Sequence, residues 1–172
     1  AFRIIPIIFG TFSIILLYAL GELVYSRRAG ITAAILGAFS FYHIFASLQV
    51  DVHGATNFFL FLAAIYSFLR FEKEKSRKWF ILSAVSAGFA SLNVYSAIFI
   101  FAIIGLYVLI SDKNPFKSII TMAKFSFISL LVYAVFPIFA FLYNKDIFIR
   151  TFLVSGFFQP AINFRYPVFI FI

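Results

Sequence analysis

The sequence predicts an all-α fold, a polytopic transmembrane helical bundle with about six or seven membrane segments. Of the 172 residues, 64% are hydrophobic and 28 are phenylalanine, and only 12% are charged. The mean hydropathy is +1.07. Soluble domains are roughly 45–50% apolar. A soluble fold of this length has too little interior for so much apolar surface, so membrane lipid must cover much of it.

Charge and composition exclude several classes of function. Basic loops on the cytoplasmic side of a membrane explain the net charge of +8, so we expect no nucleic acid partner. The chain has no cysteine, which excludes disulfides, thiol catalysis and Cys-ligated metals within it. It also lacks a Gly-rich phosphate loop and a Walker lysine. We therefore do not expect a donor nucleotide bound by a soluble fold.

We interpret residues 1–172 as a single transmembrane domain from a longer protein. The sequence starts at Ala1 without a methionine, and it stops inside the apolar run 164–172. We therefore expect some functional residues to lie outside it.

The first part of the chain contains three apolar segments close to the roughly 20 residues that a membrane span requires. They run from Ile4 to Val24, from Ile31 to about Leu48 and from about Val52 to Leu69. The basic turn 25–30 separates the first two segments. A charged loop, Arg70–Lys78, is expected after the third.

The next apolar stretch, 79–110, has a length that fits neither one span nor two. As one straight helix its 32 residues would extend about 48 Å, against a bilayer core of about 30 Å, while two full spans need about 40 residues. The polar interruption 91–96 therefore predicts a broken hairpin, two short helices that meet near Asn93 with irregular backbone facing protein or water. A single strongly tilted helix is the alternative. A further span is expected over about Ile119–Tyr143, after the turn 111–117.

Basic residues are distributed unevenly over this arrangement. If the turn at Arg27 and Arg28 is cytoplasmic and 79–110 is a hairpin, ten basic residues fall on that side and four on the other. This asymmetry follows the positive-inside rule. It predicts a multi-pass protein of the cell membrane, with the Arg70–Lys78 loop in the cytoplasm and Asp51 and Asn93 on the outer face.

Asp51 is the strongest candidate for a catalytic residue. It is a lone carboxylate between two apolar segments, and ionisable groups near membrane-embedded helices usually face a cavity, a partner or a substrate path. It could act as a general base, a metal ligand or an acceptor for a substrate hydroxyl. The alternative is a helix cap, in which the carboxylate accepts backbone N–H groups.

Four further residues are candidates for substrate binding: Gln49, His53, Asn93 and Tyr95. Asn93 and Tyr95 lie at the predicted hairpin tip, where they either satisfy backbone groups or touch a ligand. His53 and His43 have a spacing that matches no common pair of metal ligands, so a structural, hydrogen-bonded histidine is the alternative there. The cofactor stays unknown, and a divalent metal stays open.

The order and spacing of several segments resemble the multi-pass family C glycosyltransferases, of the protein O-mannosyltransferase and aminoarabinose-to-lipid A transferase types. Their common feature is a set of small and apolar residues at matched places before and after Asp51. The matching segments are 9–13, 17–21, 28–31, 33–40 and 87–92, with Asp51 opening the next apolar segment.

This resemblance implies a membrane enzyme that moves a sugar from a polyprenyl-phosphate donor to a protein, lipid or glycan acceptor on the outer face. In the family, the main catalytic acid lies in the first outer loop, which would precede Ala1. Asp51 matches the second outer-loop acidic residue, which helps to form the catalytic cavity. Relatives often carry basic residues where this chain has Gln49 and Asn93, which puts phosphate contacts at both positions in question.

Two other functions are compatible with the sequence. In a transporter, Asp51 and the broken 79–110 element would line a translocation path, since discontinuous helices are common in such proteins. In a non-catalytic structural membrane subunit, Asp51 would only cap a helix.

Overall fold

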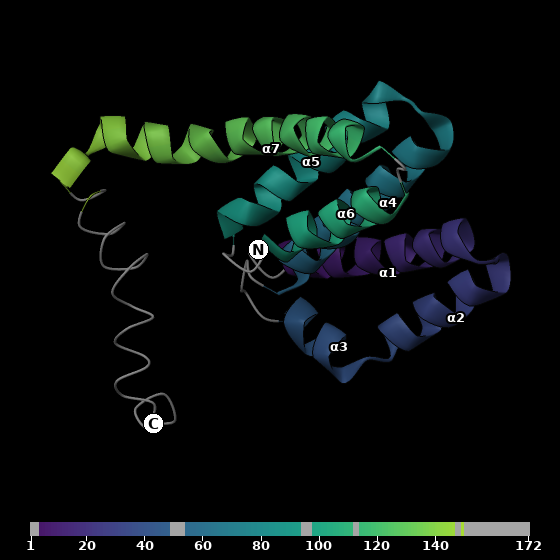
Figure 1. Cartoon of the computed structure of the whole chain (residues 1–172). Helices are drawn as coiled ribbons and strands as arrows, with labels where there is room; N and C mark the ends of the chain where they lie inside the picture. The colour runs from purple at the N-terminus through teal and green to yellow at the C-terminus, as the bar shows by residue number, and fades with distance from the viewer. Residues whose placement is uncertain (1–3, 49–53, 94–97, 112–113, 147–148, 150–172) are drawn as a thin grey trace, which may run out of the picture. The chain divides into compact units, whose positions relative to one another are not determined.

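The computed structural model describes residues 4–48, 54–93, 98–111, 114–146 and 149, and in this part of the chain every regular element is a helix (Figure 1). The predicted all-α fold is therefore confirmed. The helices are α1 (Ile4–Val24), α2 (Arg27–Ala38), α3 (Phe41–Leu48), α4 (Ala55–Glu74), α5 (Arg77–Asn93), α6 (Ile98–Ser111) and α7 (Pro115–Tyr143).

The predicted six or seven membrane segments are too many. Among the described residues, α1 and residues 116–143 of α7 are long and apolar enough to cross a membrane, and α2 with α3, bent by 58°, would make a third span. α5 has 17 residues and α6 has 14, below the roughly 20 that a span requires.

The charged segment Arg70–Lys78 is mostly helical and does not form the predicted loop. α4 continues to Glu74 and α5 begins at Arg77. Lys75, in the left-handed region at φ 52°, ends α4 by donating its N–H to the carbonyl of Phe71. The ion pair between Arg70 and Glu74 joins residues four apart, which favours continuation of the helix.

The predicted division of residues 79–110 into two helices is confirmed, with α5 ending at Asn93 and α6 beginning at Ile98. The predicted span from Ile31 to Leu48 is also divided. The hydroxyl oxygen of Ser40 accepts a hydrogen bond from the backbone N–H of His43, as the side chain of a helix N-cap does. α3 therefore starts at this point, in a different direction from α2.

The chain separates into two compact units, residues 1–133 and residues 134–172. The boundary falls within α7, four residues before Pro137. Proline has no backbone N–H, so the carbonyl of Tyr133 loses its usual helical donor at this point. The single domain expected from the sequence stays a prediction.

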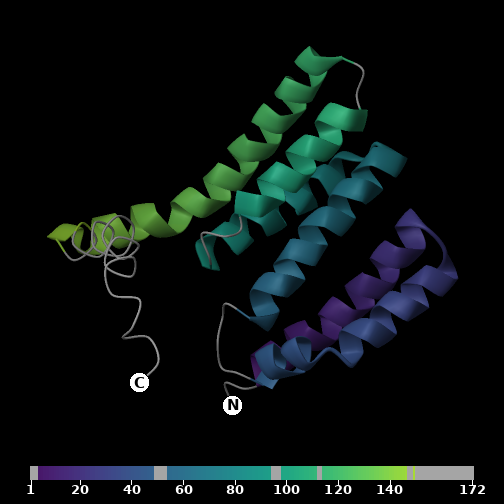
Figure 2. The ribbon, with the colours of Figure 1, turned by 60° about the horizontal axis from the view of Figure 1, so that its bottom comes forward.

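Within the first unit, α4 is the central helix, with α1 on one side and α5 on the other (Figure 2). α1 runs parallel to α4, since the ring of Phe9 meets that of Phe59 and Lys73 bonds to Leu23. α2 returns along α1, and the two backbones touch at Gly21 and Gly30: a Cβ on Gly21 would lie 2.7 Å from the Cα of Gly30. Small residues permit this close approach of two helices.

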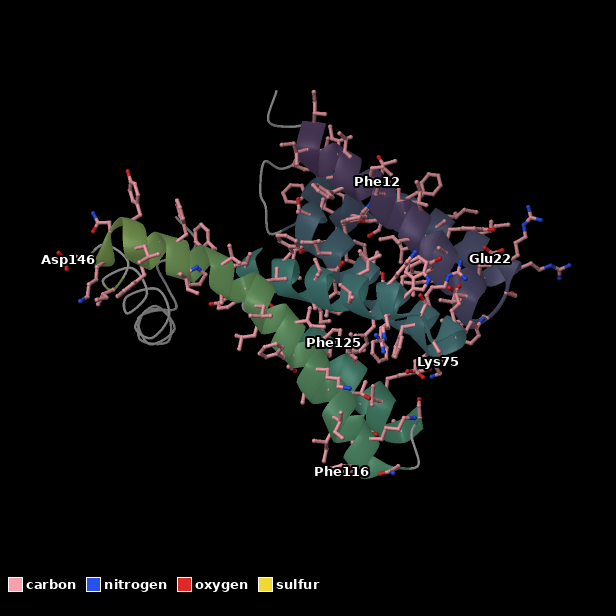
Figure 3. All side chains as sticks on the ribbon, turned by 90° about the horizontal axis from the view of Figure 1, so that it is seen from above. Phe12, Glu22, Lys75, Phe116, Phe125 and Asp146 are labelled. Carbon is pink, nitrogen blue, oxygen red and sulfur yellow. The ribbon has the colours of Figure 1, made fainter. Side chains whose placement is uncertain are left out.

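The apolar core of the first unit lies between α4, α5, α6 and the beginning of α7. Phe125, which is labelled in Figure 3, is fully buried. Its ring meets those of Phe68, Phe80 and Phe101. Serine hydroxyls join the helices, since Ser83 donates to the carbonyl of Ala64 at 2.6 Å. Such bonds hold helices together where apolar packing alone gives little direction.

Candidate functional site at the Gly54–Asn93 end

The helices of the first unit meet at two ends of different composition. α4 and α5 are joined by the short connection 75–76, and they contact each other through Tyr66 with Trp79 and through Ala64 with Ser83, so they are antiparallel. Continuing this register for ten residues along each helix brings Gly54 beside Asn93, the last residue of α5. We call this region the Gly54–Asn93 end. The opposite region, where α1 ends, α2 begins and α4 turns into α5, is called the basic end.

α1 and α3 form one wall of the Gly54–Asn93 end. The buried ring of His43 donates its Nε2–H to the carbonyl of Gly10 at 3.1 Å, which ties α3 to α1. A Cβ placed on Gly54 would lie 3.1 Å from the Cβ of Ala46, so the start of α4 packs directly on α3. A cavity of about 230 Å³ beside these contacts is lined by His43, Gly54 and Phe58, among others.

Asn57 is a candidate that the sequence analysis did not identify. It lies on α4 at the level of Ala90 of α5, by the same register, and Ala90 is fully buried. The side-chain oxygen of Asn57 is buried and has no hydrogen-bond partner within the described part of the chain. A buried acceptor without a partner costs about 1–3 kcal/mol, and such groups in native proteins call for an explanation. The available signal in the sequence was an amide, Asn57, directly before the apolar run 58–65.

Of the predicted site residues, Asn93 is at this end by its backbone position. Gln49, Asp51, His53 and Tyr95 lie outside the described residues. The described chain neighbours of the segment 49–53, Leu48 and Gly54, belong to the Gly54–Asn93 end. Tyr95 follows Asn93, the last residue of α5, by two positions. Within the described ranges, no group of three or more His, Asp or Glu residues could hold a metal ion.

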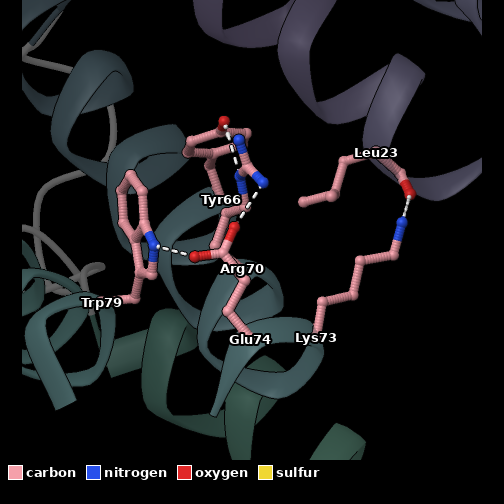
Figure 4. A network of polar contacts seen from close by, with 6 residues as sticks. All are labelled: Leu23, Tyr66, Arg70, Lys73, Glu74 and Trp79. Atoms are coloured by element: carbon pink, nitrogen blue, oxygen red, sulfur yellow. Dashed lines mark hydrogen bonds and ion pairs between the residues drawn. The ribbon is translucent and has the colours of Figure 1, made fainter. Parts of the chain in front are cut away.

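The basic end is held by two separate sets of polar contacts (Figure 4). Glu74 accepts hydrogen bonds from Arg70 and from Trp79 Nε1, and Arg70 also donates to the hydroxyl of Tyr66 at 3.1 Å. The ammonium of Lys73 donates to the carbonyl of Leu23 at 2.9 Å, in the last turn of α1, where helical carbonyls lack donors. These contacts fasten α1, α4 and α5 at the end opposite Asn93.

A family model for dolichyl-phosphate-mannose-protein mannosyltransferases matches residues 1–154, which include all seven helices. The chain belongs to this family. The resemblance noted in the sequence is therefore confirmed, and the family is one of membrane glycosyltransferases of the protein mannosyltransferase type. Neither the curated proteins nor the solved structures gave a match.

Because the chain belongs to the mannosyltransferase family, the two ends of the first unit can be compared as candidates for an enzyme's active site. The apolar helices α1 and α7 agree with a membrane protein. In the described part of the chain, the Gly54–Asn93 end carries a buried side-chain oxygen without a partner, that of Asn57. In an enzyme this end is the better candidate for chemistry, because a substrate can satisfy a polar group that the fold leaves without a hydrogen bond.

Proposed function

We propose that this chain forms part of the membrane domain of an enzyme that transfers a sugar, mannose by family, from a polyprenyl-phosphate donor to a hydroxyl acceptor on the outer face. The observation that carries the proposal is the family match over residues 1–154. The acceptor that the family description favours is a protein, and a lipid or a glycan is the alternative.

The reaction is a displacement at the anomeric carbon of the sugar. The acceptor oxygen forms a bond to this carbon while the bond from the carbon to the phosphate oxygen breaks, and its electron pair leaves with the phosphate. The acceptor proton passes to a carboxylate acting as general base. Cations or a metal must stabilise the charge on the leaving phosphate.

Asp51 is proposed to line the reaction cavity, with Gln49, His53, Asn93 and Tyr95 near the substrate. The support is positional, since Leu48 and Gly54 bound the Asp51 segment and both belong to the end where α5 stops at Asn93. Asn57 joins this set, because its buried side-chain oxygen can accept a hydrogen bond from a sugar or acceptor hydroxyl.

The Gly54–Asn93 end is proposed to face outward and the basic end to face the cytoplasm. The basic end gathers Arg27, Arg28, Lys73, Lys75 and Arg77, as the positive-inside rule expects of a cytoplasmic side. Cysteines introduced as Asp51→Cys and Lys75→Cys, in a chain that has none, should react with an impermeant thiol reagent from opposite sides. Labelling of both from one side contradicts this orientation.

Replacing Asp51 tests the catalytic assignment. Asp51→Asn keeps the shape and part of the capping ability of the side chain but removes its charge. If Asp51 supports transfer, turnover of a polyprenyl-phosphate sugar by the full-length enzyme should fall by roughly a hundredfold or more, with an unchanged thermal melt. If it only caps a helix, stability falls by about 1 kcal/mol at most and activity remains.

The matched control is Glu22→Gln, which removes an exposed carboxylate near the opposite end of α1. This variant should turn over normally. Normal turnover by a folded Asp51→Asn enzyme removes Asp51 from the site and weakens the proposed function with it.

A further inference from the structure

A groove at the basic end combines exposed cations with an apolar lining. It lies between α5 and α7, has a volume of about 460 Å³, and is lined by Arg77, Lys124, Phe80, Phe127 and Ile128, among others. The two helices are parallel and in contact along it. The rings of Phe80 and Phe125 lie 6.0 Å apart, and Ser129 donates to the carbonyl of Ala84 at 2.8 Å.

The two cations of the groove have no paired carboxylate among the described residues. In the described part of the chain, Arg77 and Lys124 make no ion pair, and no Asp or Glu is among the residues that line the groove. Their neighbours differ in this respect, since Arg70 is paired with Glu74 and Lys75 with Glu72. The groove therefore presents two uncompensated positive charges.

The rest of the lining is apolar and faces outward. Ile81 is 49% exposed and Phe127 is 62% exposed, while Phe80 and Ile128 pack against the core from the other side. The hydroxyl of Thr121, which also lines the groove, already donates to the carbonyl of Lys117. A ligand here would meet two cations at one end and hydrocarbon along the remainder.

We propose that this groove binds an anionic phospholipid. The headgroup phosphate lies between Arg77 and Lys124, and one acyl chain lies along Ile81, Phe127 and Ile128. Basic pockets between membrane helices on the side rich in Lys and Arg are the places where anionic headgroups bind. The charge fits this occupant, and the exposed apolar lining fits an acyl chain in a protein whose surface is covered by lipid. This site is separate from the Gly54–Asn93 end and has no role in the proposed transfer.

The test is lipid binding by the full-length protein, purified in detergent and followed by native mass spectrometry. The probes are phosphatidylglycerol and phosphatidylcholine with the same acyl chains. Arg77→Gln/Lys124→Gln should weaken phosphatidylglycerol binding by about thirtyfold, which corresponds to about 1 kcal/mol for each basic residue. Arg27→Gln/Arg28→Gln, which removes the same charge from the same end, should weaken it less than threefold.

A second pair of variants tests the apolar part of the site. Ile81→Trp fills the groove and should lower the affinity for both lipids severalfold, whereas Ile103→Trp, at a comparably exposed position of α6, should leave it unchanged. If the double variant melts early, Lys124→Gln alone should still weaken phosphatidylglycerol binding about fivefold. Equal losses in both charge variants, or equal affinity of the native protein for both lipids, overturn the proposal.

Discussion

The two ends of the first unit differ in how their polar groups are paired. At the basic end, Arg70, Glu74 and Trp79 bond to one another, and Lys73 completes the last turn of α1. At the Gly54–Asn93 end, the helices approach through small residues, and the side-chain oxygen of Asn57 is buried without a described partner. The paired end contributes stability, while the unpaired acceptor lowers it. Proteins leave buried polar groups unsatisfied mainly at functional sites, so this contrast supports the proposal that the Gly54–Asn93 end carries the site.

The largest expected effect is on the packing of the basic end. A Cβ on Gly30 would lie 2.5 Å from the carbonyl oxygen of Tyr18 and 3.1 Å from the nitrogen of Glu22. Because both neighbours are backbone atoms, Gly30→Ala must separate α1 from α2, and we expect a loss of about 2–3 kcal/mol in the free energy of unfolding. Unfolding in detergent would measure it.

Gly105→Ala is the matched control. Its new methyl would meet only the end of the flexible Met122 side chain, at 3.3 Å. This variant should be neutral or should gain up to about 1 kcal/mol, because alanine is the better helix former. Similar losses in the two glycine variants would contradict the close packing of α1 on α2.

A substitution at the Gly54–Asn93 end should raise the free energy of unfolding instead of lowering it. Asn57→Leu removes a buried acceptor that has no described partner, so the free energy of unfolding should rise by about 1 kcal/mol. Sugar transfer should fall at the same time if Asn57 contacts the substrate. The comparison variant is Ser83→Ala, which breaks a buried bond to the carbonyl of Ala64 and should lose about 1 kcal/mol. Two losses of equal size would show that Asn57 is paired in the folded protein.

The smallest effect is expected at the end of α1. Lys73→Gln removes the charged ammonium that donates a hydrogen bond to the carbonyl of Leu23. We expect the free energy of unfolding to fall by about 0.5 kcal/mol. Because salt screens exposed charges, the loss should shrink as ionic strength rises. If the loss of stability does not depend on salt, its cause is the packing of the lysine side-chain methylenes and not the charge.

The sequence alone predicts the parts of this structure that composition and polarity determine. The all-α fold follows from hydropathy, and the polar interruption 91–96 correctly predicts that α5 and α6 are separate. The span count is wrong because α5 and α6 are each shorter than a membrane span. The Arg70–Lys78 loop is wrong because α4 continues to Glu74, where an i,i+4 ion pair favours the helix. Ser40 was a readable signal for the break before α3, since serine is a preferred helix cap.

The candidate site is less predictable than the fold. The resemblance selects Asp51 and Asn93 from matched segments of the chain. Asn57 becomes a candidate only when the register of α4 on α5 places its amide beside the buried Ala90. A missing hydrogen-bond partner is a property of the packed helices, so it has no counterpart in the spacing of residues.

The glycine contact between α1 and α2 also bears on the order in which the chain folds. Gly21 and Gly30 are nine positions apart, and the turn between their helices is set by Ser26, whose side chain accepts the N–H of Ala29. Contacts between residues near in sequence form faster than distant ones. The Lys73–Leu23 bond, by contrast, spans fifty positions. The α1–α2 hairpin can therefore close while later helices are still being synthesised, and it then presents a finished surface on which α4 docks.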